Sequence, residues 1–323
     1  MDWSVKKMTL KQVACGLDLG NGWPKIVLDN KASKIPNWST GNEPKGQLNA
    51  KTMIAAKPIA FPLEIDNVVR WFGQDTLSLP GYQEIDQDKL KPDYIRMMFK
   101  AVLYRWLDQH RINSEWLADK RLNVVCGMPP ELYQDRQARN KAERVYRHVF
   151  DEKRPQYIKV PDKPTIAYFS AFSGLKPETL VWRAVNKQKL GFTLLVDLGY
   201  GTSDFCLLDK DTELPIKTVS LNNGLLHSHN ENNPITPWLA ELETMRGNEP
   251  ANYANITKSK IRQVARQIKL AQLVVFGGGV HLLDSETLKD LKSYASMVSL
   301  GRGYDEFSNA RWFEALAKRG IDK

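Results

Sequence analysis

The segment VACGLDLGNG at residues 13–22 decides how the rest of the chain is interpreted. An apolar run reaches Asp18 and Leu19 and then enters Gly20-Asn21-Gly22, where glycine and asparagine tolerate positive φ angles. A second, mostly apolar run, residues 23–28, follows at once. The pattern predicts two strands joined by a tight turn with few side chains to cover its backbone N–H groups.

The same pattern returns at residues 192–201 as FTLLVDLGYG, where an apolar run again ends in Asp-Leu-Gly-x-Gly. Asp197 corresponds to Asp18, and about half of the 323-residue chain separates them. A repeat at that spacing predicts two similar halves, each with a sheet and a glycine turn at its edge. A third glycine tract, Gly277-Gly278-Gly279, follows an apolar run and would let the backbone approach a flat or anionic ligand.

These turns point to phosphate chemistry. Each can present a concave set of N–H donors to a phosphate group, and carboxylates at Asp18 and Asp197 can hold a hydrated Mg²⁺. Lys25, Thr202 and Ser203 add a cation and two hydroxyls for phosphate oxygens. The chain has no G-x-x-x-x-G-K-[ST], G-x-S-x-G or H-E-x-x-H motif, which disfavours P-loop, serine-hydrolase and zinc chemistry.

Composition narrows the class of protein. The chain is 42% hydrophobic and 26% charged, which excludes disorder as its main state. No apolar stretch approaches the roughly 20 residues needed to cross a bilayer, so we expect no membrane association. Cys15, Cys126 and Cys206 lie far apart in apolar runs, which predicts three reduced, buried thiols and a cytoplasmic protein.

Periodicity predicts five helices. Most carry apolar residues at helical spacing, and one is predicted from small residues four positions apart, Ala167 and Ala171. The expected ranges are 91–110, 131–150, 164–172, 252–270 and 308–320.

Two phosphate turns followed by a later glycine tract, in that order, resemble the actin, hexokinase and heat-shock-chaperone ATPase superfamily. Within it the chain looks most like the bacterial actin-like ATPases of the ParM type, which segregate plasmids. VVCGMPPELY at residues 124–133 and VPDKPTIAY at residues 160–168 are similar to segments of that family. The resemblance implies an α/β, actin-like fold: two similar ribonuclease-H-like domains around a nucleotide cleft. Domain I would span 1–172, completed by the C-terminal helix 305–323, and domain II would span 173–304.

The resemblance also implies a site for ATP and Mg²⁺ and a role for each matching residue. Asp18 and Asp197 would hold the metal, through water, and Asp162 would orient the attacking water where the family has Glu or Gln. Asp is one methylene shorter than Glu, so another group could hold the water and Asp162 could be a loop residue. The residues expected to bind the nucleotide are Gly20, Asn21, Gly22, Lys25, Gly199, Tyr200, Gly201, Thr202, Ser203, Gly224, Gly277, Gly278 and Gly279.

The function implied is an ATPase that polymerises head to tail into dynamic filaments and moves plasmid or other extrachromosomal DNA through a DNA-binding adaptor on a centromere-like site. A small-molecule kinase or a non-polymerising scaffold ATPase on the same fold stays open as the alternative. The net charge of +9 and the basic helix at residues 131–150 also allow direct DNA contact. A solvated basic face is the simpler interpretation of that helix.

Overall fold

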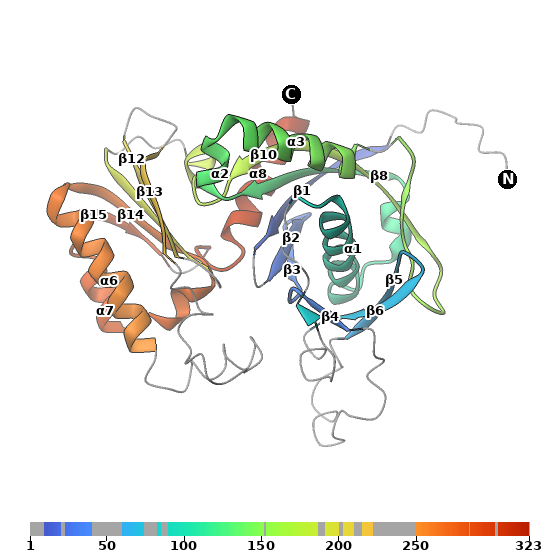
Figure 1. Cartoon of the computed structure of the whole chain (residues 1–323), viewed down its shortest axis with the longest axis horizontal. Helices are drawn as coiled ribbons and strands as arrows, with labels where there is room; N and C mark the ends of the chain where they lie inside the picture. Colours follow the sequence, from blue (N-terminus) through green and yellow to red (C-terminus); the bar gives the residue numbers. More distant parts are fainter. Residues whose placement is uncertain are drawn as a thin grey trace, which may run out of the picture.

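The computed structural model describes residues 10–20, 23–40, 60–73, 83–84, 90–151, 153–186, 191–199, 203–209, 215–221, 250–283, 285–300 and 303–322. Within these ranges no helix is both long enough and apolar enough to cross a membrane. Figure 1 shows two sheets with their helices, one built mainly from the first half of the chain and one from the second half.

The first sheet consists of β1 (Lys11–Leu19), β2 (Pro24–Leu28), β3 (Lys31–Lys34), β8 (Lys120–Met128), β9 (Gln156–Ile158) and β10 (Ile166–Pro177). Its strand order is β3-β2-β1-β8-β10-β9. The strands β1, β2 and β3 form an antiparallel meander, and β8 and β10 extend the sheet parallel to β1.

The second sheet repeats this topology. It consists of β11 (Thr193–Leu198), β12 (Ser203–Leu208), β13 (Pro215–Leu221), β14 (Leu270–Phe276) and β15 (Ala295–Ser299), in the order β13-β12-β11-β14-β15. The strands β11 to β13 are again antiparallel, and β14 and β15 again continue parallel to β11. The internal repeat and the α/β class predicted from the sequence are therefore confirmed.

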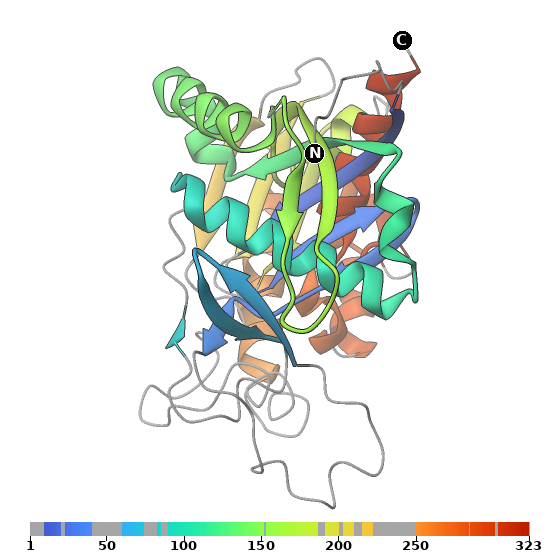
Figure 2. The same cartoon turned by 90° about the vertical axis from the view of Figure 1, so that its right-hand side faces the viewer.

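A smaller sheet of β4 (Trp38–Thr40), β5 (Phe61–Ile65), β6 (Val68–Phe72) and β7 (Gln83–Glu84) has the order β5-β6-β4-β7. In Figure 2 its blue strands lie beside the helix α1 (Pro92–Gln109). The contact is aromatic, since the ring centroid of Phe61 lies 5.0 Å from that of Tyr104 on α1.

The remaining helices are α2 (Pro130–Gln134), α3 (Arg136–Phe150), α4 (Val181–Val185), α6 (Pro250–Gln267), α7 (Ser285–Leu291) and α8 (Ser308–Ile321), with 3-10 turns η2 (Ser114–Leu117) and η4 (Gly278–Leu282). The helices predicted at 91–110, 252–270 and 308–320 are confirmed as α1, α6 and α8. The three cysteines are free and buried, as predicted.

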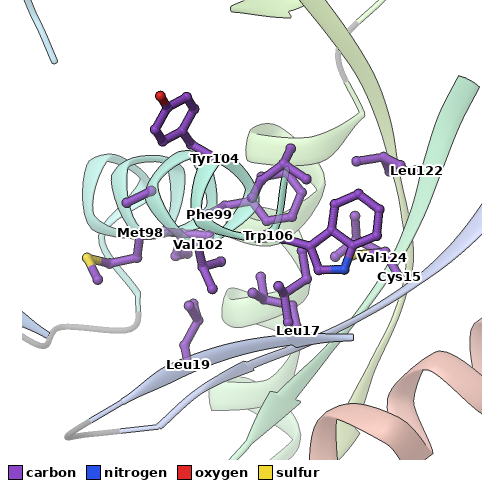
Figure 3. Close-up of a cluster of buried hydrophobic side chains, with 14 of the residues drawn as sticks. Cys15, Leu17, Leu19, Met98, Phe99, Val102, Tyr104, Trp106, Leu122 and Val124 are labelled. Atoms are coloured by element: carbon purple, nitrogen blue, oxygen red, sulfur yellow. The ribbon is translucent and has the colours of Figure 1, made fainter. Parts of the chain in front are cut away.

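Helix α1 covers the outer face of the first sheet. Figure 3 shows side chains of α1, among them Phe99 and Trp106, packed over Leu17 of β1 and Leu122 and Val124 of β8. These side chains are essentially inaccessible to solvent. Because side chains alternate along a strand, the residues of β1 between the apolar ones, Gly16 and Asp18, face the other side.

Helices α4 and α8 occupy the space between the two sheets. One buried cluster joins Val125 of the first sheet and Phe276 of the second through Trp182 of α4 and Trp312 and Phe313 of α8. The rings of Phe276 and Trp312 meet edge to face, with their centroids 4.8 Å apart. Helix α8 therefore belongs to the core that connects the two halves.

The close approach of α8 to β1 requires glycine at position 16. A Cβ on Gly16 would overlap the carbonyl oxygen of Ala310 and would lie 2.5 Å from the backbone nitrogen of Glu314. The Glu314 side chain reaches the β2–β3 turn, where Oε1 accepts a 2.8 Å hydrogen bond from the backbone N–H of Asn30. Strand, helix and turn are thus held together at one point.

Two predicted helices differ in the structure. The helix predicted at 164–172 is wrong, because these residues enter β10, where Ile166, Tyr168 and Phe172 are buried at strand spacing. Burial of every second residue is the spacing of a strand. The spacing of four between the two alanines does not indicate a helix there. The helix predicted at 131–150 is interrupted at Asp135, which is extended and caps α3 by accepting from the N–H groups of Gln137 and Ala138.

The predicted boundary after Phe172 falls inside β10, which stays paired with β8 as far as Pro177. A division of the chain between Pro177 and Thr193 leaves both large sheets whole. Helix α8 packs on β1 and β8 and also contacts the second sheet through Phe276, so the assignment of residues 305–323 to the first domain stays a prediction.

The G16A substitution should destabilise the protein, because the added methyl group would have to displace the backbone of α8. We expect a loss of about 1–3 kcal/mol in the free energy of unfolding, typical of overpacking in a core, and a lower melting temperature by differential scanning calorimetry.

The matched control is G320A, in the last turn of α8, where a new Cβ would meet no atom of another element within 4 Å. G320A should be neutral or slightly stabilising, by up to about 1 kcal/mol. A G16A protein that melts with the wild type would contradict the packing described.

Candidate functional site

The two repeated aspartates lie on the sheet faces that look toward each other. On β1, Asp18 shares its face with Gly16 and Ala14, the side covered by α8. On β11, Asp197 shares its face with Leu195, which packs in the same central cluster. Both aspartates stand near the carboxyl ends of their strands, so the fold brings together two side chains that are distant in the sequence.

Lys25 is positioned by strand pairing. It lies opposite Asp18 in the antiparallel register of β1 and β2, and its Nζ is 3.5 Å from Asp18 Oδ2. Burial lowers the pKa of the Lys25 ammonium, but the negative charges of Asp18, Glu306 and Asp197 outweigh burial, and the net pKa lies above its ordinary value. Lys25 is therefore a fixed positive charge between the aspartates, with Gly20 beside it.

The carboxylate of Asp197 is buried and accepts a hydrogen bond from α8. Its Oδ2 accepts a 2.8 Å hydrogen bond from Nδ2 of Asn309, in the first turn of α8. Burial, followed by the charges of Asp204 and Asp18, raises the pKa of Asp197 well above its usual range, against the opposing effects of Asn309 and Lys25. The protein alone therefore stabilises the ionised carboxylate of Asp197 poorly. A cation bound beside it would stabilise this ionised form.

The glycine tract closes on Asp197 from β14. Gly277 has φ +97°, and a Cβ there would lie 2.5 Å from Asp197 Oδ1 and 2.7 Å from the carbonyl oxygen of Leu198. No other residue type fits this position without moving the backbone. Gly278 and Gly279 follow as the start of η4.

The loop before α8 lies against the same tract. The Cβ of Glu306 is 3.8 Å from the position of a Cβ on Gly278, and its carboxylate forms a 2.6 Å ion pair with Lys34 of β3. The ammonium of Lys34 also lies 4.6 Å from the ring centroid of Trp23, just after the first glycine turn. This ion pair links the first sheet to the segment beside the glycine tract.

The structure describes several of the other predicted ligands. Ser203 begins β12 and is buried, Gly20 follows β1, and Gly199 follows β11. The remaining predicted nucleotide ligands lie outside the described residues; they are Asn21, Gly22, Tyr200, Gly201, Thr202 and Gly224.

The structure does not bring Asp162 to this site. It lies in the turn that precedes β10, whose early residue Phe169 is level with Arg121 near the start of β8. Because β10, β8 and β1 run parallel, Asp162 is at the sheet edge opposite Asp18. Its side chain is exposed. The predicted role of Asp162 in orienting water is not compatible with this position.

Glu178, unlike Asp162, lies at the same end of the first sheet as Asp18. It follows β10, and its backbone N–H donates a 2.8 Å hydrogen bond to the carbonyl oxygen of Met128 at the end of β8. Its Oε1 lies 2.9 Å from the position of a Cβ on Gly127. Leu17 pairs with Cys126, so Asp18 comes level with Gly127. In the sequence, Glu178 could have been found as the carboxylate in Pro-Glu-Thr, directly after the strand. The prediction of a helix at 164–172 concealed that strand and therefore its end.

The donor set fits a hydrated magnesium ion and a polyphosphate. Among the described residues no three His, Cys, Asp or Glu side chains converge closely enough to form a direct metal cage. Two carboxylates with a neighbouring ammonium suit Mg²⁺, which keeps several waters and takes further oxygens from phosphate. The buried, raised-pKa Asp197 is the observation that favours a cation here.

Comparison with known proteins supports the fold. No protein-family model and no curated protein sequence matches the chain. Among solved structures, apo psk41 ParM matches with a TM-score of 0.63 and 16% identity, over 97% of this chain and 98% of that chain. An archaeal actin homologue in complex with ADP matches with a TM-score of 0.68 and 14% identity, over 96% and 100%. A non-polymerisable quadruple mutant of pCBH ParM matches with a TM-score of 0.63 and 15% identity, over 96% and 100%. The chain has the actin-like fold that its sequence predicted.

The raised pKa of Asp197 predicts a pH-dependent gain of stability for D197N in protein free of nucleotide and metal. The folded state disfavours the ionised carboxylate, so wild-type stability falls as pH rises above the unfolded-state pKa of about 4. Asparagine removes this penalty and can still accept from Asn309. D197N should melt above the wild type near neutral pH, and the difference should shrink toward about pH 4.

Thermal unfolding followed by circular dichroism at several pH values checks this expectation. The control is D290N, which removes a surface carboxylate whose pKa is lowered by its hydrogen bond to Lys258. Its substitution should leave the melting temperature unchanged or slightly lower. A D197N protein that is less stable than the wild type at neutral pH would show that Asp197 is compensated in the folded state.

Proposed function

We propose that this chain is a cytoplasmic ATP hydrolase that binds Mg²⁺-ATP between its two sheets and assembles head to tail into dynamic filaments. The cargo we propose is plasmid or other extrachromosomal DNA, held through a DNA-binding adaptor. The observation that carries the proposal is the symmetric placement of Asp18 and Asp197 at equivalent strand ends, facing each other beside Lys25 and Gly277. The ADP complex of an archaeal actin homologue supports nucleotide binding by a protein of this fold.

In this proposal each group has a defined task. Asp18 and Asp197 hold the hydrated metal, which would neutralise charge on the phosphate oxygens. Lys25 balances the remaining phosphate charge, and backbone N–H groups of the glycine turns bind the phosphates. Glu178 orients the attacking water and accepts its proton, since it is the carboxylate that follows β10 at the edge shared with Asp18. The tract that begins at Gly277 lies against the nucleoside.

The assembly step rests on the fold. A contact between unlike surfaces that does not close into a ring generates a helical filament. One of the similar structures is a ParM made non-polymerisable by mutation, which supports assembly as the activity to test first. Because α4 and α8 pack against both sheets, a nucleotide between the sheets would act on the relative position of the two halves, and so on the surfaces that meet in a filament.

Light scattering and pelleting of the purified protein test this proposal. We expect a scattering rise above a critical concentration with Mg²⁺-ATP and none with ADP or without nucleotide. The control variant D18A, which lacks one proposed metal ligand, should neither scatter nor hydrolyse ATP. Steady hydrolysis without assembly at any protein concentration would contradict the filament. If that turnover depended on an added sugar or acid, the chain would be a small-molecule kinase.

Glu178 and Asp162 can be separated by matched amide substitutions. E178Q should slow ATP hydrolysis about 100-fold or more, the usual contribution of a positioned general base, while it keeps nucleotide binding. D162N should hydrolyse ATP at the wild-type rate, because Asp162 lies at the opposite edge of the sheet. Phosphate release under single-turnover conditions and binding of a fluorescent ATP analogue give the two readouts. Wild-type hydrolysis by E178Q would remove Glu178 from the mechanism.

A further inference from the structure

Helix α3 has one buried face and one face open to solvent. Ala142, Tyr146, Val149 and Phe150 are buried, and the helix packs against β10 and α1. Its other side lies at the periphery of the molecule, as the green helix in Figures 1 and 2 shows. The sidedness follows from apolar residues at helical spacing on one stripe only.

The solvent face of α3 is strongly basic. The helix contains five Arg and Lys residues and one acidic residue, Glu143, which is half-buried. The exposed residues of the helix are Arg136, Gln137, Asn140, Lys141, Arg144, Arg147 and His148. No exposed side chain within α3 is acidic, and the exposed aspartates nearest to it in the sequence, Asp135 and Asp151, stand at its two ends.

Three of these cations are available to a partner. Arg147 is engaged, since it pairs with Asp151 at 3.5 Å and lies over the ring of Phe172. Across the described parts of the chain, Arg136, Lys141 and Arg144 take part in no ion pair or side-chain hydrogen bond. Cations without an internal partner keep their full charge for an external anion.

We propose that the exposed face of α3 also binds the phosphate backbone of a nucleic-acid duplex directly, in addition to the contact through the proposed adaptor. Arg136 and Arg144 lie about 12 Å apart along the helix at ~1.5 Å per residue. A duplex carries one phosphate charge per about 1.7 Å of its axis, so cations distributed along and around this face can each meet a phosphate. Gln137 and Asn140 place amide donors between the cations, and such side chains also bind phosphate and sugar oxygens.

A membrane surface is a poorer occupant of this face. Interfacial helices insert an apolar face among the lipid headgroups, whereas the apolar face of α3 is buried in the protein core. The large exposed apolar side chains of the described residues are Val68, Val69, Leu132, Tyr157, Phe192 and Met297, none of which belongs to α3. An acidic protein segment could match the charge, and the test below separates it from a duplex.

Fluorescence anisotropy of a labelled duplex of about 20 base pairs tests the proposal with the full chain and no nucleotide. Three phosphate contacts correspond to a salt slope of about −2.7, which is a loss of about 40-fold in affinity between roughly 50 and 200 mM salt. The variant R136E/K141E/R144E should abolish binding. The control R266E/K269E/K292E makes the same change of charge on exposed residues beside the second sheet, and it should bind as the wild type does.

Three results would overturn the proposal. They are no duplex binding by the wild type at low salt, equal losses in the two triple variants, and tighter binding of polyglutamate than of the duplex. The last result would assign the face to an acidic protein. Circular dichroism spectra of both variants should match the wild type, because every substituted residue is solvent-exposed. None of these residues belongs to the proposed nucleotide site.

Discussion

Helix α8 can lie directly on β1 only because residue 16 has no side chain. That contact brings the helix backbone against the strand and places Asn309 within hydrogen-bonding distance of Asp197 on the other sheet. It also sets Glu314 against the β2–β3 turn. The two halves of the chain meet through this helix, so the distance between their two aspartates depends on how closely α8 approaches Gly16.

The site combines rigid backbone with unfavourable charge. Gly277 lets the second sheet's glycine tract touch the carboxylate of Asp197, and Lys25 compensates Asp18 across the first hairpin. Asp197 receives less compensation, and burial raises its pKa. Without a ligand, ionisation of Asp197 therefore costs free energy in the folded protein. A divalent cation with its phosphates would lower this cost. In the proposed function, ligand binding would be coupled to the mutual position of the sheets through the residues at the junction.

Much of the fold was predictable because its signals are local. The repeated Asp-Leu-Gly-x-Gly at Asp18 and Asp197 marks two apolar strands that end in turns, and both strands and their hairpins are present. Prediction failed at residues 164–172, where the same residues allowed both a helical and a strand spacing. Ala167 and Ala171 suit a helix at a spacing of four, yet the larger buried residues around them alternate as in a strand. The choice was made by the pairing of β10 with β8, which the local sequence does not contain.

By itself the sequence determined most of the elements, the repeat and the identity of the charged residues at the strand ends, because backbone preference and hydrophobic period act over neighbouring residues. Only the tertiary structure decided which of these residues share a site. Asp162 and Glu178 stand at the two ends of one strand, and the parallel direction of β10 and β1 selects Glu178 for the edge of Asp18. Asn309 joined the site in the same way, since its contact with Asp197 spans more than a hundred residues and depends on the packing of α8.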